Sequence, residues 1–360
     1  MQPDSPNSEA AERPQEDLGF APDSPHRADL SRILLVALLI VGAYLLLPQL
    51  VGISDAFRVV EQLNPRYIAG ALALQTLSVL SQAQVVQETL RVFASSVRFL
   101  TLLEVSLASS FATLLIPSIG LSGLALRCRY LGEYGCSLEA TAIAFTIEAV
   151  GQAAAHTAMV TVAFAHRTAQ GRQPPWAPFA LVLSVLLLGA VSLALLLTHP
   201  SRRDWRYRAL HAANWLRRHR GEPKIADATL EQRLTELHRS VAQVDAGASI
   251  RLFLGNVGRN LGSALALYLT LLALSQRVPL SAVVLSYSVS DVLGGLSSLP
   301  AGLLIGEMSL SALLNRAGVP LSMAVAATLV FRLISVWLPR GLGLVAWVDL
   351  QRHSKRPLWS

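Results

Sequence analysis

The feature that most constrains this chain is a series of apolar windows, each close to the length that crosses a lipid bilayer. Bilayer thickness requires about 20 predominantly apolar residues for one helix. The windows lie at 33–47, 66–86, 99–117, 138–165, 178–198, 250–274, 281–299 and 320–348. Helices satisfy their backbone polar groups within one segment, as lipid demands. The sequence therefore predicts an all-α, polytopic helical membrane protein with about eight transmembrane helices.

Composition supports the membrane class. Hydrophobic residues make up 52% of the chain, charged residues only 15%, and the mean hydropathy is +0.47. In a soluble protein a pI near 9.9 would suggest nucleic acid as a partner, but here the excess of Lys and Arg is typical of cytoplasmic loops facing anionic lipid. The two cysteines, Cys128 and Cys136, form no CxxC pair and have no His at ligand spacing. Neither a disulfide, a metal site nor a cofactor is predicted.

Three polar segments flank or divide the windows. Residues 1–30 hold seven acids, two bases and five prolines, which predicts a disordered tail and no signal peptide. The loop 201–245 has ten Lys or Arg against six acids, so the positive-inside rule places it in the cytoplasm. Its apolar residues at helical spacing predict an amphipathic helix, either packed on the membrane domain or binding a partner or lipid. Residues 351–360 form a short basic tail.

An internal repeat is the most informative pattern, because residues 117–148 match 300–331 at a constant separation of 183. The matched pairs are Pro117/Pro300, Leu121/Leu304, Gly123/Gly306, Leu131/Leu314, Gly135/Gly318, Leu138/Leu321 and Ala144/Ala327. Matches of Leu and Ala are common in an apolar chain, whereas Pro and Gly at equal spacing are not. Gly/Pro-interrupted segments in corresponding halves predict re-entrant or broken helices around a transporter's central site.

Ionisable residues in or beside the apolar windows mark the candidate site, since a charge at the bilayer centre costs roughly 2.5 to 3.5 kcal/mol. The candidates for a lipid headgroup or polar cavity are Arg127, Glu148, Glu307 and Arg332. We expect Arg127 and Glu307 to face one shared cavity. Residues expected near the membrane interfaces are Arg129, Glu133, Arg316 and Arg259. Glu104 and Asp291 also lie in apolar windows, and His156 is expected to be a packing residue.

At the repeated segments the chain resembles the flippase-like membrane domain of the lysylphosphatidylglycerol synthase family. The first motif, with Pro, Gly, Arg and a Glu-bearing helix, is matched by Pro117, Gly120, Gly123, Arg127, Gly135 and Glu148. The second is matched by Pro300, Gly302, Gly306, Glu307, Gly318 and Arg332. The resemblance covers about 31–350. Relatives often have an Arg directly after the first-half Glu and an acid shortly after it, where Ala149 and Gln152 stand here.

The resemblance implies a multi-pass protein of the bacterial inner membrane that handles lipid. The implied function is a lipid translocase that moves a polar phospholipid or glycolipid between leaflets, with membrane lipids as its partners. The aminoacyltransferase domain of bifunctional relatives is not expected, and no catalytic motif is found, so enzyme activity is not predicted. The alternatives are a membrane-embedded lipid-modifying transferase, or an accessory subunit whose loop 201–245 recruits a lipid-synthesis enzyme.

Two topologies remain open. If the segments 117–135 and 300–318 return to the side they entered from, the window count makes the two repeats parallel. If each segment completes a crossing, the repeats are inverted and both tails share the cytoplasmic side with the loop. The positive-inside rule favours the inverted arrangement, because of Arg352, Lys355 and Arg356.

The cytoplasmic loop gives a direct test. Ser240→Cys in intact cells should not react with a membrane-impermeant maleimide added outside, because the bases of 201–245 keep this segment inside. The same variant should label once the cells are permeabilised. Ready labelling in intact cells would contradict the assignment.

Overall fold

Every secondary-structure element in the described part of the chain is a helix, as the apolar windows predict. The computed structural model describes residues 63–91, 97–115, 121–171, 246–296 and 304–353, with 178–179, 182, 184–186 and 188–189. All of them belong to one compact unit, Asp55–Ser360. Expectations for the tail 1–30, the window 33–47, the loop 201–245 and residues 354–360 lie outside the described residues. So do the helix-break positions Pro117, Gly120, Pro300 and Gly302.

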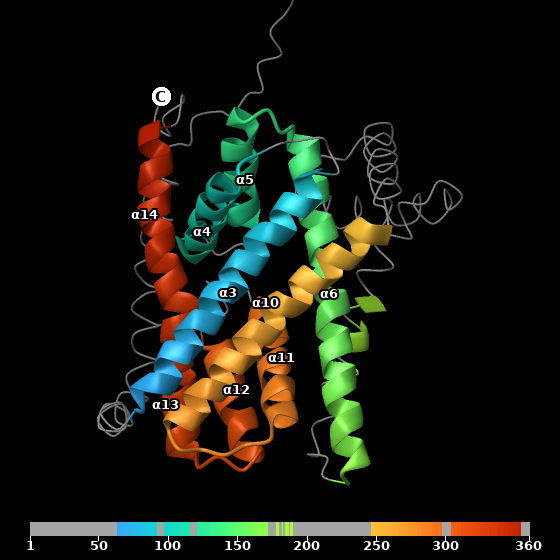
Figure 1. The fold of residues 1–360 in the computed structure, drawn as a ribbon, viewed down its shortest axis with the longest axis vertical. Helices are drawn as coiled ribbons and strands as arrows, with labels where there is room; N and C mark the ends of the chain where they lie inside the picture. The colour runs from blue at the N-terminus through green and yellow to red at the C-terminus, as the bar shows by residue number, and fades with distance from the viewer. Residues whose placement is uncertain are drawn as a thin grey trace, which may run out of the picture. The chain divides into compact units, whose positions relative to one another are not determined.

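The helices fall into two groups in chain order (Figure 1). The first group is α3 (Pro65–Arg91), α4 (Phe99–Leu115), α5 (Leu121–Glu133) and α6 (Leu138–Ala169). The second is α10 (Ala246–Ala273), α11 (Leu280–Leu296), α12 (Ile305–Arg316), α13 (Leu321–Arg332), the π-helix η3 (Leu333–Trp337) and α14 (Leu338–His353).

The first helices of the two groups, α3 and α10, pack side by side and run antiparallel. The amide of Asn64 beside the start of α3 donates to the carbonyl of Ala273 at the end of α10, at 3.2 Å. At the other end Arg251 Nε lies 3.0 Å from Glu88 Oε2. Glycines permit the close approach, since a Cβ added at Gly262 would lie 3.2 Å from an α3 carbonyl oxygen. Small residues at such contacts are typical of packed membrane helices.

Each group contains a hairpin of two shorter helices. The α4–α5 hairpin lies in the upper half of Figure 1 and the α11–α12 hairpin in the lower half, while α6 and α13–η3–α14 run past them. By sequence the windows 99–117 and 281–299 each count as a single crossing, and here α4 and α11 are each the first arm of a hairpin. Apolar length alone does not separate a spanning helix from a hairpin arm that is buried against protein. The number of crossings and the orientation of the repeats stay predictions.

The two hairpins end in the same local structure. Gly135 after α5 and Gly318 after α12 have positive φ of 83° and 102°, which glycine adopts without strain. Leu131 O accepts the amide of Cys136 at 3.1 Å, and Leu314 O accepts the amide of Val319 at 3.1 Å. These bonds satisfy carbonyls that the helix end leaves free, as in a glycine-terminated helix.

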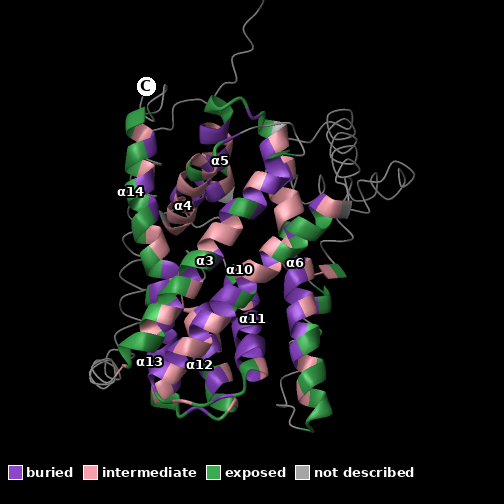
Figure 2. Cartoon of the chain, viewed as in Figure 1, coloured by how far each residue is buried: buried purple, intermediate pink, exposed green. Residues whose placement is uncertain are grey.

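Two apolar clusters hold the helices, one around each hairpin. The first joins α10, α11, α12 and α13 to α6 and includes the fully buried Leu267, Leu285 and Leu314. The second joins the end of α3 to α4, α5 and α14 through Leu90, Leu102 and Leu131. Figure 2 shows many buried positions on the helices in the lower half of the view and exposed stretches along α14.

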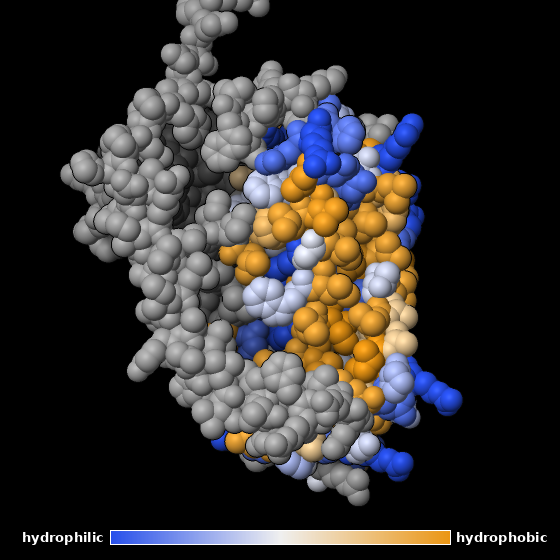
Figure 3. Space-filling model, turned by 90° about the vertical axis from the view of Figure 1, so that its left-hand side faces the viewer, coloured by the Kyte–Doolittle hydropathy of each residue, from blue (hydrophilic) through white to orange (hydrophobic). Residues whose placement is uncertain are grey.

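The outward surface is apolar, as expected for contact with lipid. Large exposed hydrophobic residues on α14 and its π-helix include Trp337, Leu342 and Val345. Figure 3 shows the side of the molecule at the left of Figure 1, where an apolar band has polar atoms above and below it. Within the described residues, Pro65–Arg91 and the continuous stretch Leu321–His353 are long and apolar enough to cross a membrane.

A pair of glycines on α14 tests its packing against α4. A Cβ at Gly343 would meet the carbonyl of Leu107 and lie 3.1 Å from Phe111 Cβ, whereas a Cβ at Gly341 meets nothing within 4 Å. We expect Gly343→Ala to lower the free energy of unfolding by about 1 to 3 kcal/mol, from overpacking. Gly341→Ala should be neutral or raise it by up to about 1 kcal/mol. Thermal unfolding in detergent measures both, and equal effects would contradict the packing.

Candidate functional site: a polar cavity between the hairpins

A polar cavity of about 520 Å³ lies where the two hairpins meet the α3–α10 pair. The first arm of each hairpin contributes hydroxyl groups, among them Ser106 and Ser110 of α4 and Ser290 of α11. The α3–α10 pair contributes Gln75 and Ser263. This volume falls within the range of small-molecule sites, about 300 to 1,000 Å³. The cavity is thus large enough for a polar headgroup.

Three arginines from three helices line the cavity. They are Arg259 of α10, Arg332 of α13 and Arg340 of α14. The π-helix between α13 and α14 lies directly between the last two, and its Ser335 and Val336 also line the wall. The window 320–348 contains a widened π-turn, Leu333–Trp337, just before Pro339. A proline cannot donate to the preceding turn, which favours such a local change of pitch.

A hydrogen-bonded network holds Arg259 against the cavity wall. Gln152 Nε2 donates to Asn260 Oδ1 at 2.9 Å, and Asn260 Nδ2 donates back to Gln152 Oε1 at 3.2 Å. Arg259 Nη1 donates to the same Oε1 at 3.4 Å. Arg259, for which the sequence predicts a place near a membrane interface, thus lines the cavity wall.

The acid on the cavity wall is Asp291 of α11, whose side chain is 43% exposed. Its Oδ2 lies 3.8 Å from Nε2 of His156 on α6. The His156 side chain is only 2% exposed and its ring stacks on Tyr287, with centroids 6.2 Å apart. The contact joins a helix of the first group to the hairpin of the second, which simple packing of His156 does not require.

The four candidate charges form two ion pairs, one in each group. Arg127 Nη1 of α5 lies 2.9 Å from Glu148 Oε2 of α6. Glu307 Oε1 of α12 lies 3.2 Å from Arg332 Nε of α13. In both pairs the short hairpin arm contacts the helix that follows it, with the signs of charge exchanged. All four side chains are largely buried, so each charge is compensated locally.

The shared cavity expected for Arg127 and Glu307 is not met in this structure. Of the four candidates, Arg332 is the one found among the residues that line the described cavity. Glu307 reaches it through Arg332, whereas Arg127 is engaged by Glu148. The sequence did not predict these pairings. Each charge on a hairpin arm pairs with a residue on the next helix of its own group.

Two glycines of the repeated motifs, Gly123 and Gly306, lie at close contacts. A Cβ at Gly123 would lie 2.9 Å from Thr113 Cγ2 on the facing hairpin arm. At Gly306 a Cβ would collide with the guanidinium of Arg332. Ser290 Oγ donates to the Gly306 carbonyl at 2.7 Å, so this turn of α12 is tied to α11. Gly306 thus gives Arg332 the space to reach Glu307.

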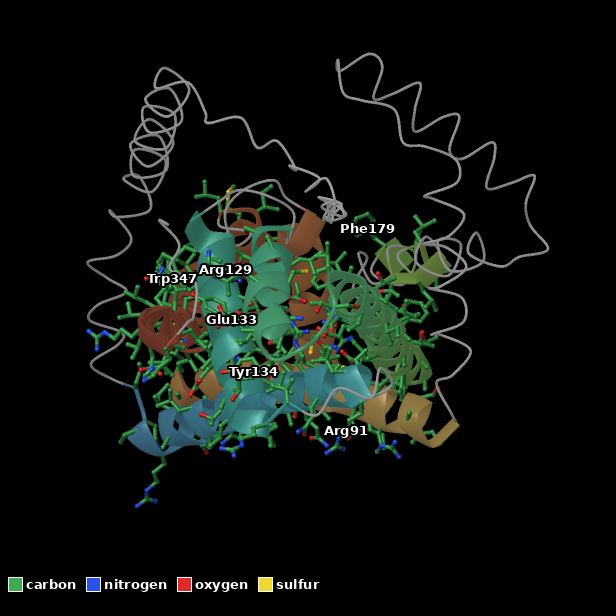
Figure 4. All side chains as sticks on the ribbon, turned by 90° about the horizontal axis from the view of Figure 1, so that it is seen from above. Arg91, Arg129, Glu133, Tyr134, Phe179 and Trp347 are labelled. Carbon is green, nitrogen blue, oxygen red and sulfur yellow. The ribbon has the colours of Figure 1, made fainter. Side chains whose placement is uncertain are left out.

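The remaining charges of the repeated segments lie at hairpin ends. Glu133 and Arg316 are exposed, as expected for residues near an interface, and Arg129 is half-buried with its guanidinium 5.8 Å from the Tyr130 ring centroid. Figure 4 shows Arg129 and Glu133 of α5, Tyr134 directly after it, and Arg91 of α3. Within the described residues, no cluster of three or more His, Cys, Asp or Glu is suited to hold a metal ion.

Sequence reasoning missed several residues of the cavity. Arg340 and Gln152 of the wall, and Asn260 bonded to Gln152, were not singled out for a role there. The α10 sequence did contain an indication, because Asn256, Arg259, Asn260 and Ser263 recur at i, i+3, i+4 and i+7. That spacing marks a polar helical face inside an apolar window.

Comparison with known protein families identifies the membrane domain. Residues 33–343 match the family described as the lysylphosphatidylglycerol synthase TM region. The chain belongs to this family. Membership makes it a membrane protein of the lysylphosphatidylglycerol synthase type, related to lipid handling, and agrees with the resemblance of the repeated motifs. No match was found among curated proteins.

The buried pair in the first group can be tested by a double-mutant cycle. Arg127→Met leaves Glu148 buried without its cation, and we expect a loss of about 3 to 5 kcal/mol in the free energy of unfolding. The double variant Arg127→Met/Glu148→Leu should lose less than the single variant, because no charge is left unpaired. Arg66→Met on the exposed start of α3 is the control. Additive single effects in detergent unfolding would show that the two residues are not coupled.

Proposed function

We propose that this protein binds the headgroup of a phospholipid in the cavity between its hairpins and moves the lipid between the leaflets. The observation that carries the proposal is the set of three arginines on the wall of a cavity enclosed by an apolar outer surface. A cavity of this polarity suits a headgroup, while the exposed apolar faces beside it suit acyl chains. Family membership supports the lipid class of the substrate.

The charges favour a phosphate. Arg259, Arg332 and Arg340 line the cavity, Glu307 compensates the charge of Arg332, and Asp291 is the acid on the wall, so one positive charge remains for an anion. Within the described residues, the buried Nε of Arg340 has no hydrogen-bond partner. Guanidinium groups bind phosphate oxygens through paired N–H donors, and such charge-assisted bonds are the strong ones. A phosphodiester would therefore satisfy a donor that the protein leaves free, which a neutral glycolipid would do less well.

The proposed transport mechanism is alternating access built on an inverted repeat in a multi-pass membrane domain. Its support is the antiparallel α3–α10 pair, the hairpins in opposite halves, and helix ends that keep the 183-residue separation. Helix α5 ends at 133 and α6 begins at 138, while α12 ends at 316 and α13 begins at 321. In transporters built from such repeats, one half moves against the other around a site near the midplane. The hairpins would be the moving parts.

Reconstituted vesicles test the proposal. Purified full-length protein is placed in vesicles containing acyl-labelled NBD-phosphatidylglycerol, and dithionite reports how fast the label crosses the bilayer. We expect faster crossing than in protein-free vesicles, and little acceleration of NBD-glucosylceramide, which has no phosphate. Arg340→Gln and Arg259→Gln should each slow the crossing by about tenfold, the loss expected for one charge-assisted hydrogen bond.

Arg316→Gln is the matched control, because it removes an exposed arginine at the end of α12 and leaves the cavity intact. The Arg316→Gln variant should move the labelled lipid across the bilayer at the wild-type rate. Equal rates for protein-containing and protein-free vesicles would overturn the proposed translocation. Equal acceleration of both labelled lipids would overturn the preference for phosphate.

A further inference from the structure

His156 and Asp291 face each other at a distance that is longer than a hydrogen bond. Nε2 of His156 is buried without a hydrogen-bond partner in the described residues, yet it faces Oδ2 of Asp291 at 3.8 Å. Asp291 in turn lines the cavity. A histidine and a carboxylate facing each other inside a membrane domain are the usual components of a proton relay.

The neighbouring hydrogen bonds define the neutral form of His156. Arg259 can only donate, so the atom of Gln152 that it contacts at 3.4 Å is the carbonyl oxygen Oε1. The amide nitrogen of Gln152 therefore faces Nδ1 of His156, at 3.5 Å. Nδ1 is the acceptor of this contact, and the ring proton lies on Nε2, toward Asp291.

A second proton on His156 would disturb this arrangement. Both ring nitrogens of the imidazolium are donors, so Nδ1–H would oppose the amide N–H groups of Gln152. Rotation of the Gln152 amide removes the conflict by turning Oε1 toward the ring. The same rotation withdraws the oxygen that holds Arg259 and Asn260. Arg259 is then released toward the cavity, while the imidazolium attracts the Asp291 carboxylate and draws α6 toward α11.

We propose that His156 is a proton-binding site that couples a transmembrane proton gradient to lipid movement, through Gln152 and Arg259 on one side and Asp291 on the other. One proton from the cavity side reaches Nδ1 past Gln152, which lines the cavity and contacts this nitrogen, when the cavity is open to one side of the membrane. The same proton leaves Nδ1 for water when the cavity opens to the other side. The inference rests on the proposed translocation and adds its driving force.

The groups around His156 are consistent with one reversible protonation. Asp291 and Tyr287 face it from α11, and Arg259 acts on it from α10. On its own helix α6 the facing group is Gln152, which carries no charge. Burial of the ring opposes the imidazolium most, and Arg259 opposes it until the rotation of Gln152 lets the guanidinium move away, whereas the Asp291 carboxylate and the Ser288 carbonyl stabilise it.

The test uses vesicles with NBD-phosphatidylglycerol and an imposed pH difference of one unit. If one proton moves with each lipid, the ratio of label between the two leaflets should shift by up to about tenfold in wild-type protein. His156→Gln should abolish this shift. Asp291→Asn, which keeps the side-chain shape, should abolish or strongly reduce it and serves as the second variant if His156→Gln fails to fold.

His166→Gln is the matched control, since His166 lies exposed on the same helix with Gln170 four residues away at 3.3 Å. It should keep the full shift. If wild-type protein moves the label but the ratio ignores the pH difference, the coupling is overturned while the translocation stands. A shift that persists in both His156→Gln and Asp291→Asn also overturns it. If no label moves at all, the proposed function fails and the coupling fails with it.

Discussion

The arrangement of this protein depends on the close antiparallel contact between α3 and α10. Ser78 of α3 donates to the carbonyl of Arg259 at 2.7 Å and lies 2.9 Å from Ser263, which also donates to Gln75 at 3.3 Å. Lipid provides no hydrophobic force between helices, so packing of small residues and such hydrogen bonds must hold the pair together. Because the two helices point in opposite directions, the hairpins that follow them enter the domain from opposite ends.

Each hairpin places two short apolar helices against the longer helices of the domain. Here the hairpin arms are buried in separate apolar clusters, and the cavity lies between them. The ion pairs Arg127–Glu148 and Glu307–Arg332 tie each short arm to the helix after it. The polar groups that line the cavity thus lie between the two hairpins, where they would contact a bound headgroup.

Much of the helical structure could be predicted from the sequence, but less of the site. Apolar windows predicted the helices, and the spacing of Gly135 and Gly318 predicted equivalent turns, because a positive φ leaves a mark in residue type. A hairpin arm such as α4 and a spanning helix have the same apolar composition, so the windows alone do not give the number of crossings. The cavity wall needed tertiary information: Arg259 looks interfacial until Gln152, distant in sequence, is found beside it.

The π-helix between α13 and α14 shows how chain length, rather than residue type, can set the position of a side chain. Eight residues apart on a regular α-helix, Arg332 and Arg340 would point about 80° apart around the axis. The π-turn accommodates one additional residue, about 100° of rotation, and so brings the two arginines close to the same face. Residues seven apart on a regular α-helix differ by only about 20° around the axis, so loss of a single residue within Leu333–Trp337 would restore the regular pitch and keep the two arginines on one face. Conversion of the π-turn to α-helix without loss of a residue would instead rotate all of α14 by about 100°.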